Sequence, residues 1–96
     1  MSWQAGDVRL AAGNRELVFR LTLGALAEIC DRLGTRSVRT MTQRLARATP
    51  EDWRGVAVAC LRPVHGEGAG ALSRTLSAGR IAQTTIQLFE EAFGAS

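Results

Sequence analysis

In Leu21-Thr-Leu-Gly-Ala-Leu-Ala-Glu-Ile-Cys-Asp-Arg-Leu-Gly34 an alternating strand pattern gives way to a helix whose two ends are both marked. Thr22 is a residue type that caps helix N-termini, and Gly34 is the type that ends helices in the left-handed conformation. The charged residues of the segment fall on one face, and its apolar residues recur at the helical period on the other. The segment therefore predicts a helix over residues 22–34 with the apolar positions Leu23, Leu26, Ile29, Cys30 and Leu33.

Residues 7–21, just before this helix, alternate between apolar and polar side chains and are interrupted at Ala12-Gly13-Asn14. A period of two with such a break is typical of a β-hairpin that has one buried face. An isolated hairpin is only marginally stable in water, so helices must cover its apolar face. We expect the helix over 22–34 to supply this cover through Leu26, Ile29, Cys30 and Leu33.

Further helices are predicted over residues 37–48, 50–62 and 80–93. The clearest start signal is Thr49-Pro50-Glu51-Asp52, because threonine caps an N-terminus, proline fits the first turn and carboxylates interact favourably with the helix dipole. Residues 63–71 contain three glycines without periodicity and predict a flexible loop. The expected fold class is α+β, with an N-terminal β-hairpin packed against a bundle of about four short helices in a single domain over residues 1–96.

The predicted helix over 80–93 has an unusually wide apolar face. By the helical period this face covers an arc of about 160°, more than the roughly 100° that a surface helix usually buries. We therefore expect the helix either to lie deep in the domain or to carry apolar surface for a partner. The residues of this face are Ile81, Thr85, Ile86, Leu88, Phe89, Ala92 and Phe93. Phe89 and Phe93, like Trp53 in the preceding helix, are more simply interpreted as core residues.

The basic residues are all arginines, and nine of the twelve lie in residues 32–80 beside three acidic residues. A row of them, the arginine ridge, lies on one side of the helix over 37–48: Arg36, Arg39, Arg44 and Arg47. Such a surface attracts acidic proteins, binds nucleic acid non-specifically, or only keeps the chain dissolved. Nucleic acid is the weaker choice among partners, because the ridge has no aromatic residue to stack on bases.

The composition, with 46% hydrophobic and 22% charged residues, is that of a globular chain, and no apolar run approaches the roughly 20 residues of a membrane span. We therefore expect a soluble protein that makes no membrane contact. The first residues carry neither the basic nor the apolar region of a secretory signal, so the cytoplasm is the expected compartment.

Residue types suited to catalysis or metal binding are scarce. His65 is the only side chain that ordinarily titrates near neutral pH, and in the predicted loop we expect it to be exposed to solvent. Gly66-Glu-Gly-Ala-Gly70 follows a helix and lacks the Lys-Ser/Thr ending of a phosphate-binding loop. Cys30 and Cys60 are expected to be small buried side chains without a disulfide. We predict no catalytic residue, no metal, no cofactor and no enzymatic activity.

The order of these features resembles the small tail proteins of gene transfer agents and related long-tailed phages. The resemblance rests most on Leu21-Thr-Leu-Gly-Ala-Leu-Ala-Glu28, followed by the Thr-Pro-Glu-Asp-Trp helix start and the terminal Glu91-Ala-Phe-Gly94, and it covers most of the chain. It implies a bacterial tail morphogenesis protein, in the cytoplasm or on the particle. The favoured role is a tail assembly chaperone that binds the tape-measure protein before the tail tube polymerises. The alternatives are a structural subunit associated with the tail tube and, less favoured, a small Arg-rich nucleic-acid-binding protein.

A chaperone for a long helical protein must cover apolar seams that would otherwise aggregate, and it must do so reversibly. Two surfaces of this chain are candidates for that contact. We expect an apolar contact from Ile86, Phe89 and Phe93, and we expect Arg39, Arg44 and Arg47 to steer an acidic stretch of the partner. Further copies of the same chain are a second candidate partner.

Overall fold

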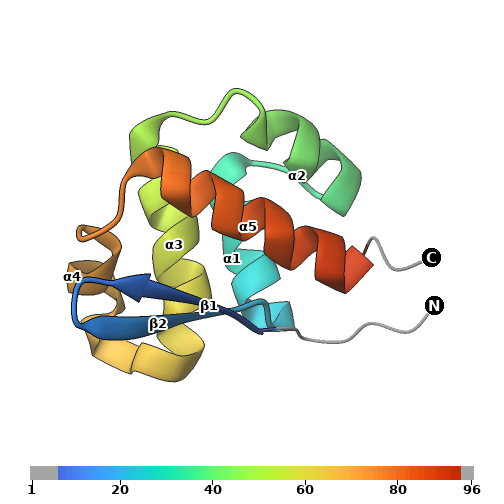
Figure 1. Ribbon diagram of the computed structural model, residues 1–96. Coiled ribbons are helices and arrows are strands. Elements are labelled where there is room, and N and C mark those ends of the chain that lie inside the picture. The colour runs from blue at the N-terminus through green and yellow to red at the C-terminus, as the bar shows by residue number, and fades with distance from the viewer. Residues whose placement is uncertain (1–6, 94–96) are drawn as a thin grey trace.

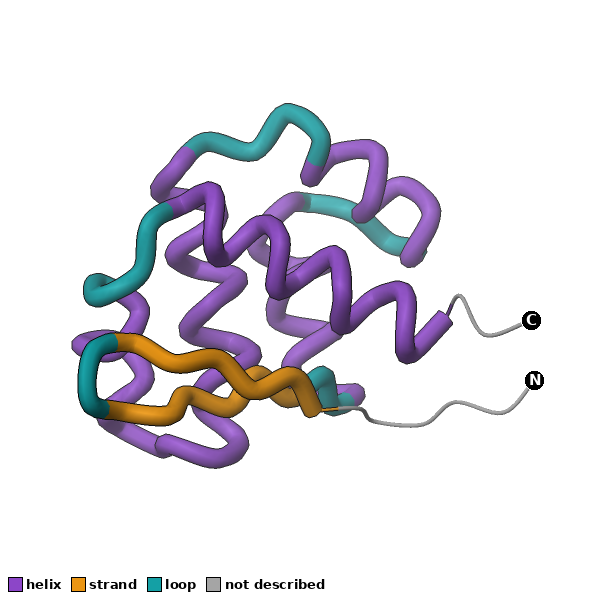
Figure 2. Tube along the Cα trace, viewed as in Figure 1, coloured by secondary structure: helices purple, strands orange, loops and turns teal. Residues whose placement is uncertain are grey.

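The chain folds as a β-hairpin followed by helices, which confirms the α+β class (Figures 1 and 2). This computed structural model describes residues 7–93, apart from the side chains of Val38 and Phe93. The elements are β1 (Asp7–Ala12), β2 (Arg15–Arg20), α1 (Leu23–Leu33), α2 (Val38–Leu45), α3 (Pro50–His65), a 3-10 turn (Gly66–Gly68), α4 (Ala69–Ser73) and α5 (Ala78–Phe93).

The hairpin forms where the alternation predicts it. β1 and β2 pair antiparallel from Asp7 opposite Arg20 to Ala12 opposite Arg15, so Gly13 and Asn14 make a two-residue turn. Gly13 has φ of 64° and Asn14 does not have a positive φ, as in a type II′ turn with glycine at its first central position. Most of the inward face is covered, with Val8, Leu17 and Phe19 buried and Leu10 half-buried.

Ion pairs lie on the outward face of the hairpin. The Arg20 guanidinium donates from Nε and from one terminal nitrogen to the two Asp7 carboxylate oxygens, at 2.8 and 2.9 Å. Arg9 and Glu16 form a second pair at 3.1 Å. The hydrogen bonds from Arg20 hold the pKa of Asp7 below its ordinary value. Opposite charges on neighbouring strands favour this register. Shifting one strand by one residue would turn its charged side chains to the buried face.

Helix α3 lies at the centre of the packing and contacts β2, α1, α4 and α5. Its buried residues spread around much of its circumference and are mostly small: Val56, Ala57, Ala59, Cys60 and Leu61. The expectation that α1 covers the hairpin is wrong, because α1 packs mainly against α3 and α2. Instead, α3 and α5 cover the apolar face of the hairpin. The small side chains of α3 allow the strands to approach this helix closely, and α1 packs on another side of it.

The helix caps are those that the sequence predicts. The Thr22 hydroxyl accepts a hydrogen bond from the Ala25 backbone N–H at 2.9 Å, and Gly34 ends α1 with φ of 69°. Thr49 and Asp52 form a capping box at the start of α3, with hydrogen bonds of 3.1 and 3.2 Å. α5 begins two residues earlier than expected, at Ala78.

Helix α2 is shorter than predicted. It starts after Ser37, which forms a capping box with Thr40, but it ends at Leu45 instead of continuing to residue 48. The reason lies downstream, because Thr49 must adopt the extended conformation both as an N-cap and as the residue before a proline. The arginine ridge is consequently divided, with Arg36 before the helix and Arg47 in the turn after it.

The predicted loop over residues 63–71 is helical. α3 continues through Pro63 to His65, and the 3-10 turn and α4 follow directly. Proline removes one backbone hydrogen bond, and in the last turn of a helix that loss leaves most of the helix unaffected. The glycine-rich segment is held by burial of Ala69 and Leu72 in the core and by contact of α4 with α3. One buried turn is too short to show a helical period in the sequence.

His65 is not a solvent-exposed loop residue, as the sequence led us to expect. It is half-buried at the end of α3, and its Nε2 accepts a hydrogen bond of 3.0 Å from the Val18 backbone N–H. In the β1–β2 ladder the backbone N–H of Val18 points away from β1, so it lies on the free edge of β2. The imidazole therefore satisfies an edge donor that would otherwise need water or another strand.

Replacement of His65 by alanine should lower the free energy of unfolding by about 1 kcal/mol, because the Val18 N–H loses its acceptor. Val64→Ala is the matched control, since the neighbouring Val64 side chain is exposed and should change stability little. Urea denaturation of both variants measures the difference. Equal stability of the two variants would show that the imidazole does not hold the strand.

Candidate functional site

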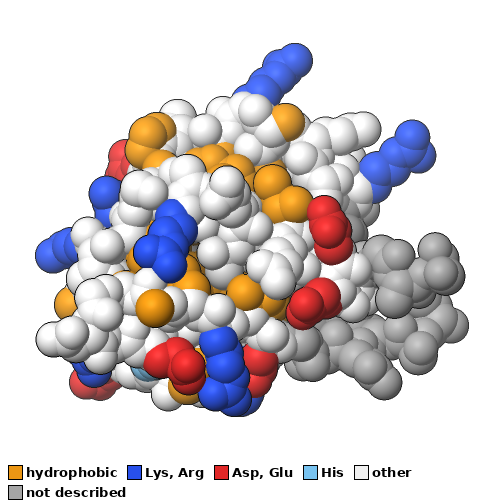
Figure 3. Space-filling model, viewed as in Figure 1, with side chains coloured by type: hydrophobic (Ala, Val, Ile, Leu, Met, Phe, Trp, Pro, Cys, Tyr) orange, Lys and Arg blue, Asp and Glu red, His pale blue; other side chains and the backbone are white. Residues whose placement is uncertain are grey.

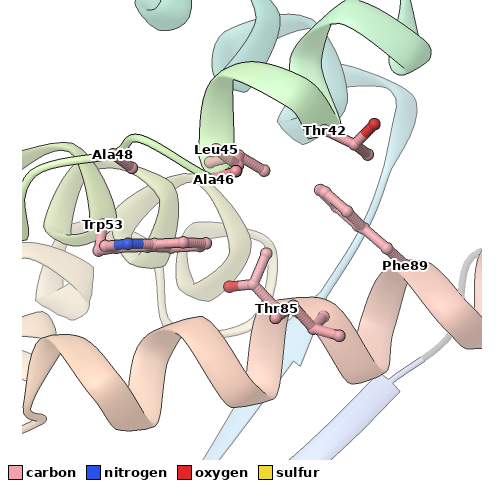
Figure 4. Close-up of a pocket in the computed structure, with 8 residues that line it drawn as sticks. Thr42, Leu45, Ala46, Ala48, Trp53, Thr85 and Phe89 are labelled. Carbon is pink, nitrogen blue, oxygen red and sulfur yellow. The ribbon is translucent and has the colours of Figure 1, made fainter.

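An open apolar groove of about 340 Å³ runs between α2 and α5 (Figure 4). It exists because α2 packs against α1, whereas α5 packs against α3 and the hairpin. The start of α3 and the turn before it close one end. Its lining residues are Thr42, Leu45, Ala46, Ala48, Trp53, Thr85, Ile86 and Phe89.

The walls of the groove are aromatic and aliphatic. Trp53 contributes from the first turns of α3 and is half-buried, and Phe89 contributes from α5 with 8% of its surface exposed. Ile86 lies at the rim with 52% exposed, which makes it one of the few large apolar side chains that the described part of the chain leaves open to solvent. These side chains offer a partner an apolar surface with an exposed edge.

Thr85 places a hydroxyl among the apolar side chains beneath this groove. Its side chain is fully buried, and its Oγ1 has no hydrogen-bond partner. The adjacent Thr84 is also buried, but its hydroxyl donates to the Arg80 carbonyl at 2.8 Å. An unsatisfied buried hydroxyl costs about 1–3 kcal/mol. The two neighbouring threonines thus have similar burial and opposite hydrogen-bonding states.

The two rims of the groove carry opposite charge. Arg39 is three residues before Thr42 and seven before Ala46, so it projects on the groove side of α2. On α5, Glu90 follows Ile86 by four residues and projects beside it. Hydrophobic side chains gather between these rims in Figure 3, where acidic side chains flank the C-terminal half of α5. By this placement one arginine flanks the groove on α2 and one glutamate flanks it on α5.

The arginines predicted to steer a partner do not all lie at the groove. Arg44 and Arg47 line a polar depression together with Gln43 and residues at the end of α1. Arg44 also lies 4.0 Å from the Asp52 carboxylate, which links α2 to the start of α3. The pKa of Asp52 is lowered, chiefly by the hydrogen bond that the Thr49 backbone N–H donates to its carboxylate. Arg39 and Arg47 are exposed and form no ion pair with any described residue.

The predicted apolar contact residues have different positions. Ile86 is exposed at the rim, and Phe89 is buried as part of the groove wall. The side chain of Phe93 lies outside the described residues. The sequence did not predict Trp53 and Thr85 as lining residues. An aromatic residue or a threonine within an apolar helical face is normally interpreted as part of the core. The signal that could have identified Thr85 is a polar side chain in the middle of an otherwise apolar face.

The two cysteine side chains, which are candidate reactive groups, are buried or half-buried. Burial raises the pKa of the Cys60 thiol to about 12, and Cys30 is half-buried with its Sγ 3.6 Å from the Met41 sulfur. Within residues 7–93, no three or more histidine, cysteine or acidic side chains come together as a metal site would require. In the same range no helix combines the length and apolar character needed to cross a membrane.

Comparisons of the chain with protein families, with curated proteins and with solved structures found no significant match.

Replacement of Thr85 by valine should stabilise the protein, since it removes the unsatisfied hydroxyl and keeps the side-chain shape. We expect the free energy of unfolding to rise by about 1 kcal/mol and the melting temperature by roughly 4–8 °C. Thr84→Val is the control and should lower stability by about 1 kcal/mol, because its hydroxyl is bonded. Calorimetry on both variants tests this, and a loss of stability in Thr85→Val would contradict it.

Proposed function

We propose that this chain is a non-enzymatic binding protein that holds an amphipathic helix of another protein in the groove between α2 and α5. The observation that carries the proposal is the groove itself, an apolar channel between two helices with exposed Ile86 on its edge. Together with the resemblance to small phage-type tail proteins, this makes a tail assembly chaperone the favoured role. Its partner would then be the tape-measure protein.

The shape of the groove supports a helical occupant. Amphipathic helices bind by placing an apolar stripe into a channel lined by helices, with charged residues left at the edges. The basic rim at Arg39 and the acidic rim at Glu90 would meet opposite charges on the two sides of that stripe. Rim charges act mainly on the rate and direction of association, which suits a chaperone that must later release its partner.

The other roles need different surfaces. A tail tube subunit polymerises through extended strands, and the sheet within residues 7–93 consists of the β1–β2 hairpin. A nucleic-acid-binding protein would use a continuous basic face, whereas the acidic side chain of Glu90 projects beside Ile86 at the groove. No described feature favours either alternative over a helix-binding chaperone.

Ile86→Glu should weaken binding to the tape-measure protein by on the order of ten-fold or more, because a buried isoleucine contributes about 1.5–3 kcal/mol and a carboxylate adds a desolvation cost. Leu23→Glu is the matched control, since Leu23 is 67% exposed and lies outside the groove lining. Co-expression with the tape-measure protein, pull-down and titration calorimetry measure both variants. Absence of a complex with the wild-type chain, or equal weakening by both variants, would reject the proposal.

Arg39→Glu should slow association with an acidic partner several-fold, and the difference should shrink as salt increases. Arg74→Glu is the control, because Arg74 is also exposed, lies outside the groove lining and gives the same change in net charge. Stopped-flow association rates at two salt concentrations distinguish a local effect from a general one. Equal slowing by the two variants would leave Arg39 without a steering role.

A further inference from the structure

The polar depression beside α2 has a volume of about 580 Å³ and lies on the opposite side of this helix from the groove. One wall is the end of α1, residues 33–35. The other wall comes from α2 and the turn after it, and its residues are three or four positions apart and share one helical face: Thr40, Gln43, Arg44 and Arg47. The described lining residues include two guanidinium groups and no carboxylate, so the depression is positively charged.

Most arginines of the hairpin, α1 and α3 are held by a partner within the protein. Arg9, Arg20 and Arg62 pair with carboxylates of Glu16, Asp7 and Glu28. Arg32 and Arg54 donate hydrogen bonds to backbone carbonyls at 3.2 and 3.1 Å. These side chains serve to hold the fold together.

The arginines around α2 are different. Arg36, Arg39 and Arg47 are exposed, and their guanidinium groups form no ion pair or hydrogen bond with any described residue. Arg44 approaches the Asp52 carboxylate only to 4.0 Å. Like charges three or four residues apart destabilise a helix, and α2 is only eight residues long. The free protein therefore carries positive charge along α2 that its own residues do not balance.

The end of α1 explains part of this arrangement. Leu33 and Gly34 place the C-terminal end of the α1 dipole at the depression, and its partial negative charge attracts cations. Neither Arg44 nor Arg47 donates a hydrogen bond to a carbonyl of the described residues. The dipole thus favours the gathering of the two side chains, while their N–H donors remain open to a ligand.

We infer that the depression is a docking site for an acidic segment of a protein partner, whose carboxylates pair with Arg44 and Arg47. A carboxylate matches the planar guanidinium fork and accepts two parallel hydrogen bonds from it. Nucleic acid fits less well, because the sites that follow a single strand add aromatic side chains for base stacking, and none lines the depression among the described residues. The inference rests on the proposed function only in taking the partner to be a protein, and it assigns a surface separate from the groove.

The test titrates the full chain with the peptide hexaglutamate at low salt, where charge pairing is least screened. NMR shifts should concentrate at the Gln43 and Arg47 amides. Arg47→Gln should weaken binding about two- to five-fold, because it removes one cation of the site. Arg74→Gln is the matched control, since Arg74 is also exposed and unpaired, lies outside the depression and loses the same charge. Urea denaturation should show wild-type stability for both variants, because neither guanidinium has a partner within the described residues.

Three results would overturn the acidic-segment site. They are shifts spread over the whole surface, equal weakening by the two variants, and tighter binding of a thymidine hexanucleotide than of hexaglutamate, which would make nucleic acid the ligand. The titration uses neither the tape-measure protein nor the groove. If Ile86→Glu disrupts the tape-measure complex and hexaglutamate does not bind, the chaperone proposal stands and the depression is rejected. If hexaglutamate binds at the depression and no tape-measure complex forms, the depression stands and the chaperone proposal is rejected.

Discussion

Burial of α3 on several sides is the interaction on which the rest of the structure depends. A two-stranded hairpin is only marginally stable by itself. Helices α1, α4 and α5 each bury an apolar face against α3. Small residues such as Ala57, Ala59 and Cys60 let these elements approach the helix closely. The capping box at Thr49 and Asp52 fixes where this central helix begins, and His65 at its other end holds the edge of β2.

The groove arises because α2, unlike α1, α4 and α5, does not pack mainly against α3. α2 is short, packs on α1 with Met41 next to Cys30, and is linked to α3 by the Arg44–Asp52 ion pair. α5 is held elsewhere, on α3 and the hairpin. Two helices positioned by different neighbours need not meet, and the space between them stays open.

The buried hydroxyl of Thr85 lowers the stability of the packing around α5. Valine at position 85 would pack there without a buried polar atom, whereas the threonine retains a hydroxyl with no internal partner. Departures from local consistency of this kind are found most often at functional sites. Arg39 on α2 and Glu90 on α5 place charges of opposite sign on the two sides of the groove.

Local signals in the sequence determined the hairpin, the caps at Thr22, Gly34 and Thr49, and the α+β class, because each depends on residues close together in the chain. The helical turn at residues 66–73 and the role of His65 were decided only by the tertiary structure, since both depend on burial against α3 or on the edge of β2. The groove belongs to the same category. Its walls come from α2, α3 and α5. The loose packing between α2 and α5 depends on how three helices share one core, which no periodicity within any of them can express.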